Sequence, residues 1–297
     1  MIDVNQTFGA ERDDALAPPH PLLWEPLVRA ALLEDLGRAG DLTSDAIVPA
    51  ALWARGRVVA RQAGCVAGLG PATRALTLFD PRVVVEAKVE DGAVVAADTT
   101  LAVVHGPARA LLGAERTLLN LLGRLCGIAS ATRSVVEALR GARARVVCTR
   151  KTTPGLRVLE KYAVRAGGGA NHRFGLDDAV LIKDNHLALA GSVGEAVSRV
   201  RRHVGHMVKV EIEVDDLAQL EAALAAGVDA VLLDNMDLEQ LRRATSLVAG
   251  RVLTEASGGI RPDNAAAIAA TGVDLLSIGW LTHSAPSLDV ALDLELG

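Results

Sequence analysis

The chain has 297 residues, 50% of them hydrophobic and 23% charged, a composition typical of a folded protein with a buried core. No apolar run approaches the roughly 20 residues of a membrane-spanning helix, which excludes a membrane-spanning protein. The net charge of −5 and the scarcity of aromatic residues argue against a nucleic-acid-binding protein. Three widely spaced cysteines without a CxxC pattern exclude a disulfide scaffold or a zinc ribbon and predict a cytoplasmic location.

The first half of the chain predicts helices on either side of a β-rich region. Residues 1–20 carry early acidic residues and several prolines, and predict a loose leader rather than a secretory signal. Apolar residues at helical spacing predict helices over 24–37 and 113–140. Short apolar runs broken by glycine predict β segments in between, at 57–70, 82–106 and 108–112.

The second half repeats a strand and then a helix. Helical stretches such as 215–228 and 262–273 separate the apolar runs, and the later runs recur about every 22 residues. This alternation predicts a parallel sheet, and its regular period favours a closed β/α barrel over an open sheet. Six strands can be placed, at 145–150, 179–184, 208–214, 230–235, 251–257 and 275–280.

Polar residues stand at the carboxyl ends of these strands, where a β/α barrel builds its active site. Five of the six ends carry charged side chains, so we expect one common site rather than unrelated solvated loops. The residues at the six ends are Arg150 and Lys151, Lys183 and Asp184, Glu211 and Glu213, Asp234 and Asn235, Glu255 and Ser257, and Gly279.

The positive charges of this acidic protein are concentrated in one segment. Between Arg143 and Arg173 there are eight basic residues and a single acid, Glu160. Three of the five lysines of the chain lie between 151 and 183, although arginine is far more common overall. A compact ammonium suits a phosphate or a carboxylate, so the segment predicts a small polyanionic ligand.

The acidic residues and a glycine turn fall on the later strands. Glu211 and Glu213 are two residues apart on one strand and therefore share a face. Carboxylates near a phosphate site hold Mg²⁺ or sugar hydroxyls, or else form salt bridges with the arginines. The sequence SGGI at 257–260 precedes a helix, a pattern typical of a phosphate cradle.

The same residues carry a family likeness. The segment TRKTTPGLRVLEKYAVRAGGGANHRFGLDDAVLIKDNHL at 149–187 strongly resembles the quinolinate phosphoribosyltransferases. The likeness extends over roughly 22–296, with further matching segments at 34–49, 115–129, 210–224, 231–236, 255–260 and 272–284.

The resemblance implies an α/β protein of the type II phosphoribosyltransferase kind. An N-terminal α/β sandwich domain is expected at 1–126, with the tail 284–297 packing back on it, followed by an incomplete, seven-stranded β/α barrel at 127–283. Only six of those strands come from the sequence pattern, and the seventh comes from the resemblance. The implied reaction joins quinolinate to phosphoribosyl pyrophosphate with loss of CO2 in NAD biosynthesis. It requires Mg²⁺ and a homodimer or larger homo-oligomer.

The resemblance also assigns roles to individual residues. Quinolinate carboxylates would meet Arg150, His172, Arg173 and Lys183, with Arg116 reaching in from a partner subunit, and Thr149 would also bind substrate. Lys151 would meet the pyrophosphate of the donor, and Glu213 and Asp234 would hold ribose hydroxyls and Mg²⁺, with Glu211 less certain. The 5′-phosphate would lie on Ser257, Gly258, Gly259, Ile278, Gly279 and Trp280, and the catalytic set would be Lys151, Lys183, Glu213 and Asp234.

Two other interpretations fit part of the pattern. A β/α-barrel aldolase would use Lys183 as a Schiff base, but such an enzyme does not need an arginine cluster of this size. A binding protein of the transport-associated subgroup of the same family would hold a small anion without turnover. That subgroup tends to lose the LIKDNH signature, which is intact here at 181–186.

Overall fold

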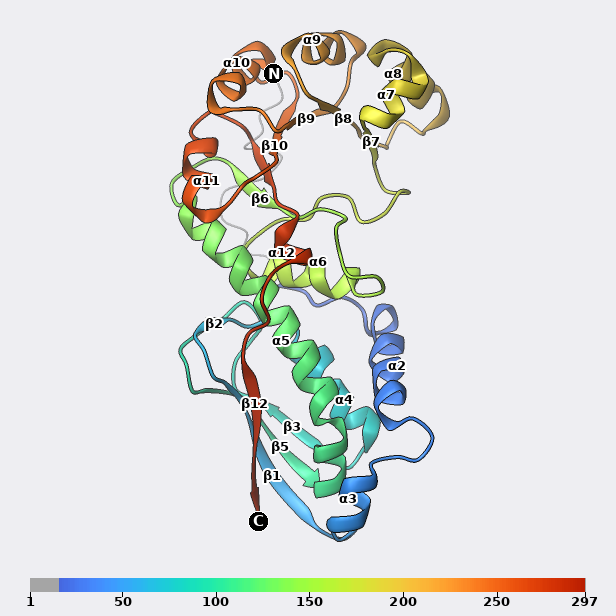
Figure 1. The fold of residues 1–297 in the computed structure, drawn as a ribbon, viewed down its shortest axis with the longest axis vertical. Helices are drawn as coiled ribbons and strands as arrows, with labels where there is room; N and C mark the ends of the chain where they lie inside the picture. Colours follow the sequence, from blue (N-terminus) through green and yellow to red (C-terminus); the bar gives the residue numbers. More distant parts are fainter. Residues whose placement is uncertain (1–15, 297) are drawn as a thin grey trace. The chain divides into compact units, whose positions relative to one another are not determined.

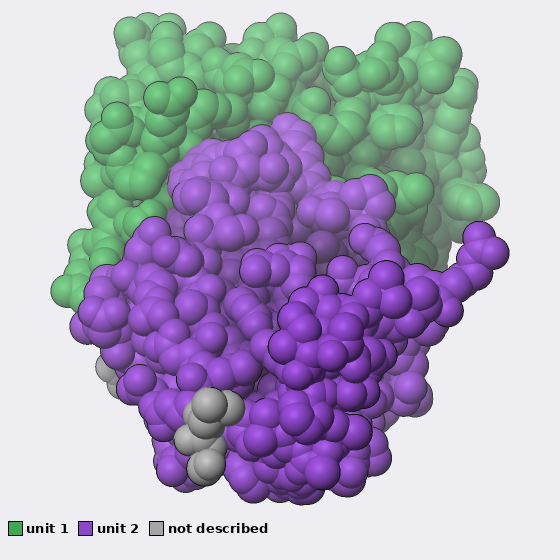
Figure 2. Space-filling model, turned by 60° about the horizontal axis from the view of Figure 1, so that its bottom comes forward, with its two compact units in different colours: residues 1–15, 134–150, 169–279 green, residues 16–133, 151–168, 280–297 purple. Residues whose placement is uncertain are grey.

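The computed structural model describes residues 16–296 in two compact units (Figures 1 and 2). Unit 1 contains 134–150 and 169–279, and unit 2 contains 16–133, 151–168 and 280–296. The predicted leader lies mostly outside the described residues, and the predicted domain boundaries stay a prediction. No helix in the described part of the chain is both long enough and apolar enough to cross a membrane.

Unit 2 is built on an antiparallel sheet with strand order β12-β1-β5-β3. The C-terminal strand β12 pairs with β1 along its whole length, from Ala54↔Leu296 to Ala60↔Val290. The strands of the unit are β1 (Trp53–Ala60), β2 (Gly64–Cys65), β3 (Val84–Ala87), β4 (Val94–Val95), β5 (Thr99–Pro107) and β12 (Val290–Leu296). Its helices are η1 (Pro21–Leu23), α2 (Glu25–Leu36), α3 (Leu42–Ile47), α4 (Leu69–Phe79), α6 (Arg157–Ala166), α12 (Trp280–His283) and most of α5 (Ala108–Ala138).

The sequence pattern was right about α2 and wrong about two other stretches of unit 2. Residues 108–112 form the first turns of α5 rather than a strand, because Pro107 ends β5 and the apolar residues that follow continue the period of the helix. The helix α4 was missed; most of it falls between the predicted β segments at 57–70 and 82–106. Its N-terminus is capped from a distance, since Asp91 accepts hydrogen bonds from the backbone of Gly68 (2.9 Å) and Leu69 (3.1 Å).

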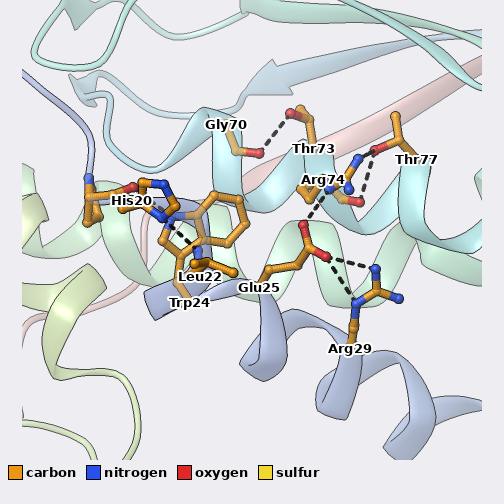
Figure 3. A network of polar contacts seen from close by, with 10 residues as sticks. His20, Leu22, Trp24, Glu25, Arg29, Gly70, Thr73, Arg74 and Thr77 are labelled. Atoms are coloured by element: carbon orange, nitrogen blue, oxygen red, sulfur yellow. Dashed lines mark hydrogen bonds and ion pairs between the residues drawn. The ribbon is translucent and has the colours of Figure 1, made fainter.

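A polar network joins α2 to α4 in unit 2 (Figure 3). Glu25 accepts hydrogen bonds from Arg29 (2.7 Å) and from Arg74 (3.0 Å), and these two arginines hold the pKa of Glu25 below its usual value. At the start of the same segment, the ring of His20 accepts a hydrogen bond from the backbone of Leu22 (3.2 Å). These contacts fix the beginning of α2 against α4.

The C-terminal segment lies very close to α5. A Cβ placed on Gly127 would be 2.1 Å from the carbonyl oxygen of Pro286, and one on Gly123 would be 2.9 Å from that of Leu288. The backbone of Leu288 in turn donates to the carbonyl of Gly123 at 2.9 Å. The two glycines are four residues apart and share a helix face, so they allow the tail to run directly along the helix.

Unit 1 is a six-stranded parallel sheet with strand order β6-β11-β10-β9-β8-β7. All six strands predicted from the sequence are present. The described part of unit 1 contains these six strands and not the expected seventh; an isolated parallel bridge joins Val147 of β6 to Ala170. The strands are β6 (Arg145–Val147), β7 (Val180–Ile182), β8 (Val210–Val214), β9 (Ala230–Asp234), β10 (Leu253–Ser257) and β11 (Leu275–Ser277).

Helices cover one face of this sheet (Figure 1). Ile212 pairs with Val231, and Leu233 pairs with Ala256, so the register places these fully or nearly fully buried side chains in one apolar layer. The opposite face carries the polar residues that alternate with them. The covering helices are α7 (Asp184–Ala190), α8 (Val193–His203), α9 (Leu217–Ala226), α10 (Leu238–Val248) and α11 (Pro262–Ala269).

Replacing Gly127 with alanine is expected to destabilise unit 2, because the added Cβ would overlap the main chain of the tail. The free energy of unfolding should fall by about 1–3 kcal/mol, the usual cost of overpacking. Chemical denaturation measures it. Gly70→Ala on α4 is the control, since a Cβ there meets no atom within 4 Å and stability should hold or rise slightly. Equal stability of the two variants would contradict the close approach.

Candidate active site

The register of the parallel sheet brings the predicted acidic residues onto one face. Glu213 pairs with Leu232 and Leu232 with Glu255, so these positions lie side by side across β8, β9 and β10. One layer nearer the carboxyl ends, Asp234 pairs with Ser257 and Ser257 with Ser277. The predicted site residues of these strands therefore converge on the carboxyl-end half of one face.

His172 connects two of the strands through their glutamates. Its Nε2 lies 2.9 Å from Oε2 of Glu211 and 3.6 Å from Oε1 of Glu255. All three side chains are at least half buried, and Glu255 is only 2% exposed. The three offer donor atoms within 4.8 Å of one another, so this triad is a candidate metal-binding cluster.

The backbone decides the tautomer of His172. The N–H of Arg173 donates to Nδ1 of the ring at 2.7 Å, and a backbone amide is always a donor. Nδ1 therefore carries no proton, and Nε2 carries the proton that it donates to Glu211. In this arrangement both ring nitrogens are engaged by the protein itself, and a metal ion at the triad would have to displace the Nε2 proton.

Lys183 stands at the end of β7 and is paired across to β8. Its Nζ lies 2.6 Å from Oε2 of Glu213, whose side chain is 14% exposed against 45% for the lysine. The backbone N–H of Lys183 donates to Nδ1 of His186 (2.9 Å), which fixes the turn into α7. Because Glu211 and Glu213 share a face, one strand supplies the hydrogen-bond acceptor of His172 and the counter-charge of Lys183.

Two arginines lie close enough to affect one another. Burial, and then the positive charge of Arg150, lower the pKa of Arg173, while Glu211 and Asp178 act in the opposite direction. The guanidinium of Arg173 also donates to the carbonyl of Ala179 at 3.0 Å. Two partly desolvated cations of this kind provide a binding place for an anion.

The glycine turn after β10 has the backbone shape of an anion cradle. Gly258 and Gly259 both have positive φ angles, of 100° and 61°. Asn235, itself at a φ of 52°, donates its N–H to the carbonyl of Ser257 (2.9 Å), and Asn264 donates its side-chain amide to the carbonyl of Gly259 (3.0 Å). Successive main-chain N–H groups before α11 are thereby presented together.

Sequence reasoning missed some members of this site and left others unresolved. Asn264 was not singled out, although its place three residues after Arg261 is a capping-box position that could have revealed it. Glu255 was noted only as a strand end, and Glu211 was the less certain glutamate; Glu211 accepts the hydrogen bond of His172, and Glu255 lies 3.6 Å from the same nitrogen. Arg116, Lys151 and Trp280 belong to unit 2, whereas the remaining predicted site residues belong to unit 1.

Comparison with known proteins identifies the family of the chain. Residues 41–126 match the model of the N-terminal domain of quinolinate phosphoribosyl transferase, and residues 128–293 match that of its C-terminal domain. The chain belongs to the quinolinate phosphoribosyl transferase family.

Its relatives match over nearly their whole length. A probable nicotinate-nucleotide pyrophosphorylase (carboxylating) of Bacillus subtilis is 44% identical, covering 93% of this chain and 94% of the relative. The Mycobacterium leprae nicotinate-nucleotide pyrophosphorylase (carboxylating) is 46% identical over 90% of this chain and 95% of its own. The crystal structure of NadC from Streptococcus pyogenes superposes with a TM-score of 0.90 at 42% identity, covering 94% and 99% of the two chains.

The tautomer of His172 can be measured directly. We expect ¹⁵N spectra of histidine-labelled protein to show a neutral ring protonated at Nε2, because the Arg173 amide occupies Nδ1. His172→Gln supplies the assignment, since one ring signal must disappear. A ring protonated at Nδ1 would contradict the deduced arrangement.

Proposed function

We propose that this protein transfers the phosphoribosyl group of phosphoribosyl pyrophosphate to quinolinate with decarboxylation. The products are nicotinate mononucleotide, pyrophosphate and CO2, and the reaction belongs to NAD biosynthesis. The observation that carries the proposal is the convergence of carboxylates from β8, β9 and β10 on one sheet face, with Lys183 2.6 Å from Glu213. Arg150 and Arg173, outside the strands between β6 and β7, add positive charge. The activity named for the curated relatives needs a diacid and a sugar pyrophosphate, which this charge pattern suits.

Quinolinate would be held through its two carboxylates. Arg150, Arg173 and Lys183 supply the cations, and Thr149 and His172 also belong to unit 1. Lys183 is paired with Glu213 at 2.6 Å, so a substrate carboxylate would replace Glu213 as the anionic partner of the ammonium. Arg116 would act from a partner subunit in a homodimer or larger homo-oligomer.

The donor would be bound by the acids and the glycine turn. Glu213 and Asp234 would hold ribose hydroxyls and Mg²⁺, and two carboxylates are the oxygen ligands that this ion prefers. When bound, the ion neutralises charge on the pyrophosphate leaving group. Lys151 would meet the pyrophosphate, and the 5′-phosphate would lie on the 257–259 turn together with Ile278, Gly279 and Trp280.

The chemistry needs no protein nucleophile. As pyrophosphate leaves C1 of the ribose, positive charge develops there and the pyridine nitrogen attacks. The ring nitrogen then becomes cationic, so the C2 carboxylate can leave as CO2: the electrons of the broken C–C bond stay at C2, stabilised by the adjacent positive nitrogen, and a proton from water then bonds to C2. The side chains orient the two substrates and stabilise charge, which are the usual contributions in such transfers.

One observation weighs against the aldolase interpretation. A Schiff base requires the free amine of Lys183, whereas its Nζ donates to Glu213 at 2.6 Å, a bond of the ammonium form. All three cysteines are buried, and the cytoplasmic location stays a prediction.

The deciding experiment supplies purified protein with quinolinate, phosphoribosyl pyrophosphate and Mg²⁺. We expect stoichiometric CO2 and nicotinate mononucleotide. Omitting Mg²⁺ should abolish turnover, and borohydride with substrate should trap no adduct on Lys183. Ligand binding without any product would instead favour the transport-associated binding protein.

Removing the proposed carboxylate contacts should weaken quinolinate binding. Arg116→Ala and Arg173→Ala should each cost about 2–5 kcal/mol of binding free energy, the loss typical of a buried charge-assisted contact. Equilibrium titration measures this. If Arg116 acts across an interface, mixing Arg116→Ala with Lys183→Ala protein should restore part of the activity in hybrid oligomers, whereas no recovery would place Arg116 within its own subunit's site.

The glycine turn gives an independent test of the donor site. A Cβ on Gly258 would lie 2.1 Å from Oδ1 of Asn235, and its φ of 100° is one that alanine avoids. Gly258→Ala should raise KM for phosphoribosyl pyrophosphate at least about tenfold, because the distorted turn would no longer direct its backbone N–H groups at the 5′-phosphate. Gly194→Ala, where a Cβ meets nothing within 4 Å, is the matched control.

A further inference from the structure

A closed circuit of hydrogen bonds in unit 2 surrounds the main chain of Lys151. Its centre is Glu160 on α6, whose side chain is 0% exposed. Oε1 of Glu160 accepts from Nη2 of Arg124 (2.8 Å) on α5. Oε2 accepts from the backbone N–H of Thr153 (3.0 Å), and the hydroxyl of Thr153 adds a bond to Oε1 (2.7 Å).

The circuit closes through the last helix of the chain. Arg124 also donates to the carbonyl of Thr282 and, at 3.2 Å, to that of Ala285. Thr282, which is 0% exposed, donates its hydroxyl back to the carbonyl of Lys151 at 2.8 Å. Helices α5, α6 and α12 are thus connected to one short stretch of backbone.

That stretch contains no helix or strand of its own. Side chains nevertheless hold its backbone at two points, the carbonyl of Lys151 through Thr282 and the N–H of Thr153 through Glu160, and the hydroxyl of Thr152 between them accepts from Arg157 (2.9 Å). Local secondary structure cannot fix this backbone, so the side-chain bonds do. The Lys151 side chain itself is exposed.

Stability alone does not account for such an arrangement. Burying a charged pair costs desolvation energy, and apolar residues of similar volume often stabilise a core as well or better. Here the pair of Arg124 and Glu160 is connected to a stretch of irregular backbone, and that stretch carries the exposed ammonium of Lys151. Fixing the position of a single positive charge is most useful where that charge must bind a phosphate-type anion in one geometry.

We propose that Arg124, Glu160 and Thr282 are positioning residues that fix the backbone from which Lys151 presents its ammonium to a pyrophosphate group. The inference rests on the proposed function for the identity of the donor substrate. The three residues need not touch the substrate. They determine where the cation stands before the substrate arrives, which lowers the cost of ordering it on binding.

The test is Thr282→Val, which removes one hydroxyl and keeps the side-chain shape. We expect KM for phosphoribosyl pyrophosphate to rise about five- to tenfold, the effect of losing one hydrogen bond, with KM for quinolinate unchanged. The matched control is Thr132→Val on α5. Thr132 is likewise 0% exposed and donates to a backbone carbonyl, that of Ile128, at 2.8 Å. Thr282→Ser, which keeps the hydroxyl, should restore the KM.

Coupling to Lys151 separates positioning from general damage. Lys151→Ala should raise the same KM, and adding Thr282→Val to it should raise the KM no further, because the two changes act through one group. Equal effects of Thr282→Val and Thr132→Val, or additive effects in the double variant, would overturn the inference. Should Thr282→Val fail to accumulate, Thr153→Val removes the next hydroxyl of the circuit. The same rise in KM for phosphoribosyl pyrophosphate, with KM for quinolinate unchanged, is then expected, and its absence would overturn the inference.

A binding measurement distinguishes this inference from the proposed function. Calorimetry with inorganic pyrophosphate and Mg²⁺ needs no turnover. If the wild-type protein makes no nicotinate mononucleotide but Thr282→Val weakens pyrophosphate binding relative to Thr132→Val, positioning holds and the proposed reaction fails. If product forms and pyrophosphate binds both variants equally, the reaction holds and the positioning inference is wrong.

Discussion

Charge compensation on the polar face of the parallel sheet is the constraint on which the candidate active site depends. The strands of unit 1 alternate buried apolar residues with glutamate, aspartate and serine. Because carboxylates cannot be left alone in a half-buried position, each needs a cation or a donor beside it. On β8, Glu211 binds His172 and Glu213 binds Lys183. His172 and Lys183, which are assigned to substrate binding, thus also stabilise the partly buried carboxylates of Glu211 and Glu213.

This double use has a chemical consequence. A group that already has a protein partner is held in one orientation, and a ligand then competes with that partner instead of ordering a loose side chain. The ring of His172 is the extreme case, since the Arg173 amide and Glu211 occupy both nitrogens. The ring in turn is bonded to Glu211 and to the Arg173 backbone, so all three are held together. Lys151 shows the same principle in unit 2, where buried groups fix its backbone while its side chain stays exposed.

How far the sequence leads depends on whether the signal is local. The six strands of unit 1 were predicted because an apolar run followed by a polar end is a local pattern, and α2 was predicted from its period. Helix α4 was missed because its cap is Asp91, more than twenty residues away. Residues 108–112 were misassigned because a short apolar run has no period of its own until the rest of α5 is added.

The sequence by itself determined that carboxylates and cations would meet at the carboxyl ends of parallel strands, since strand direction and period two are fixed by the chain. It also carried the family likeness. Only the tertiary structure decided which side chains form contacts. Glu211 hydrogen-bonds to His172, and Glu255 of β10 lies near both. Asn264 and Asn235 hydrogen-bond to the glycine turn. Register between strands and long-range hydrogen bonds set those pairings, and neither is encoded in any short stretch of residues.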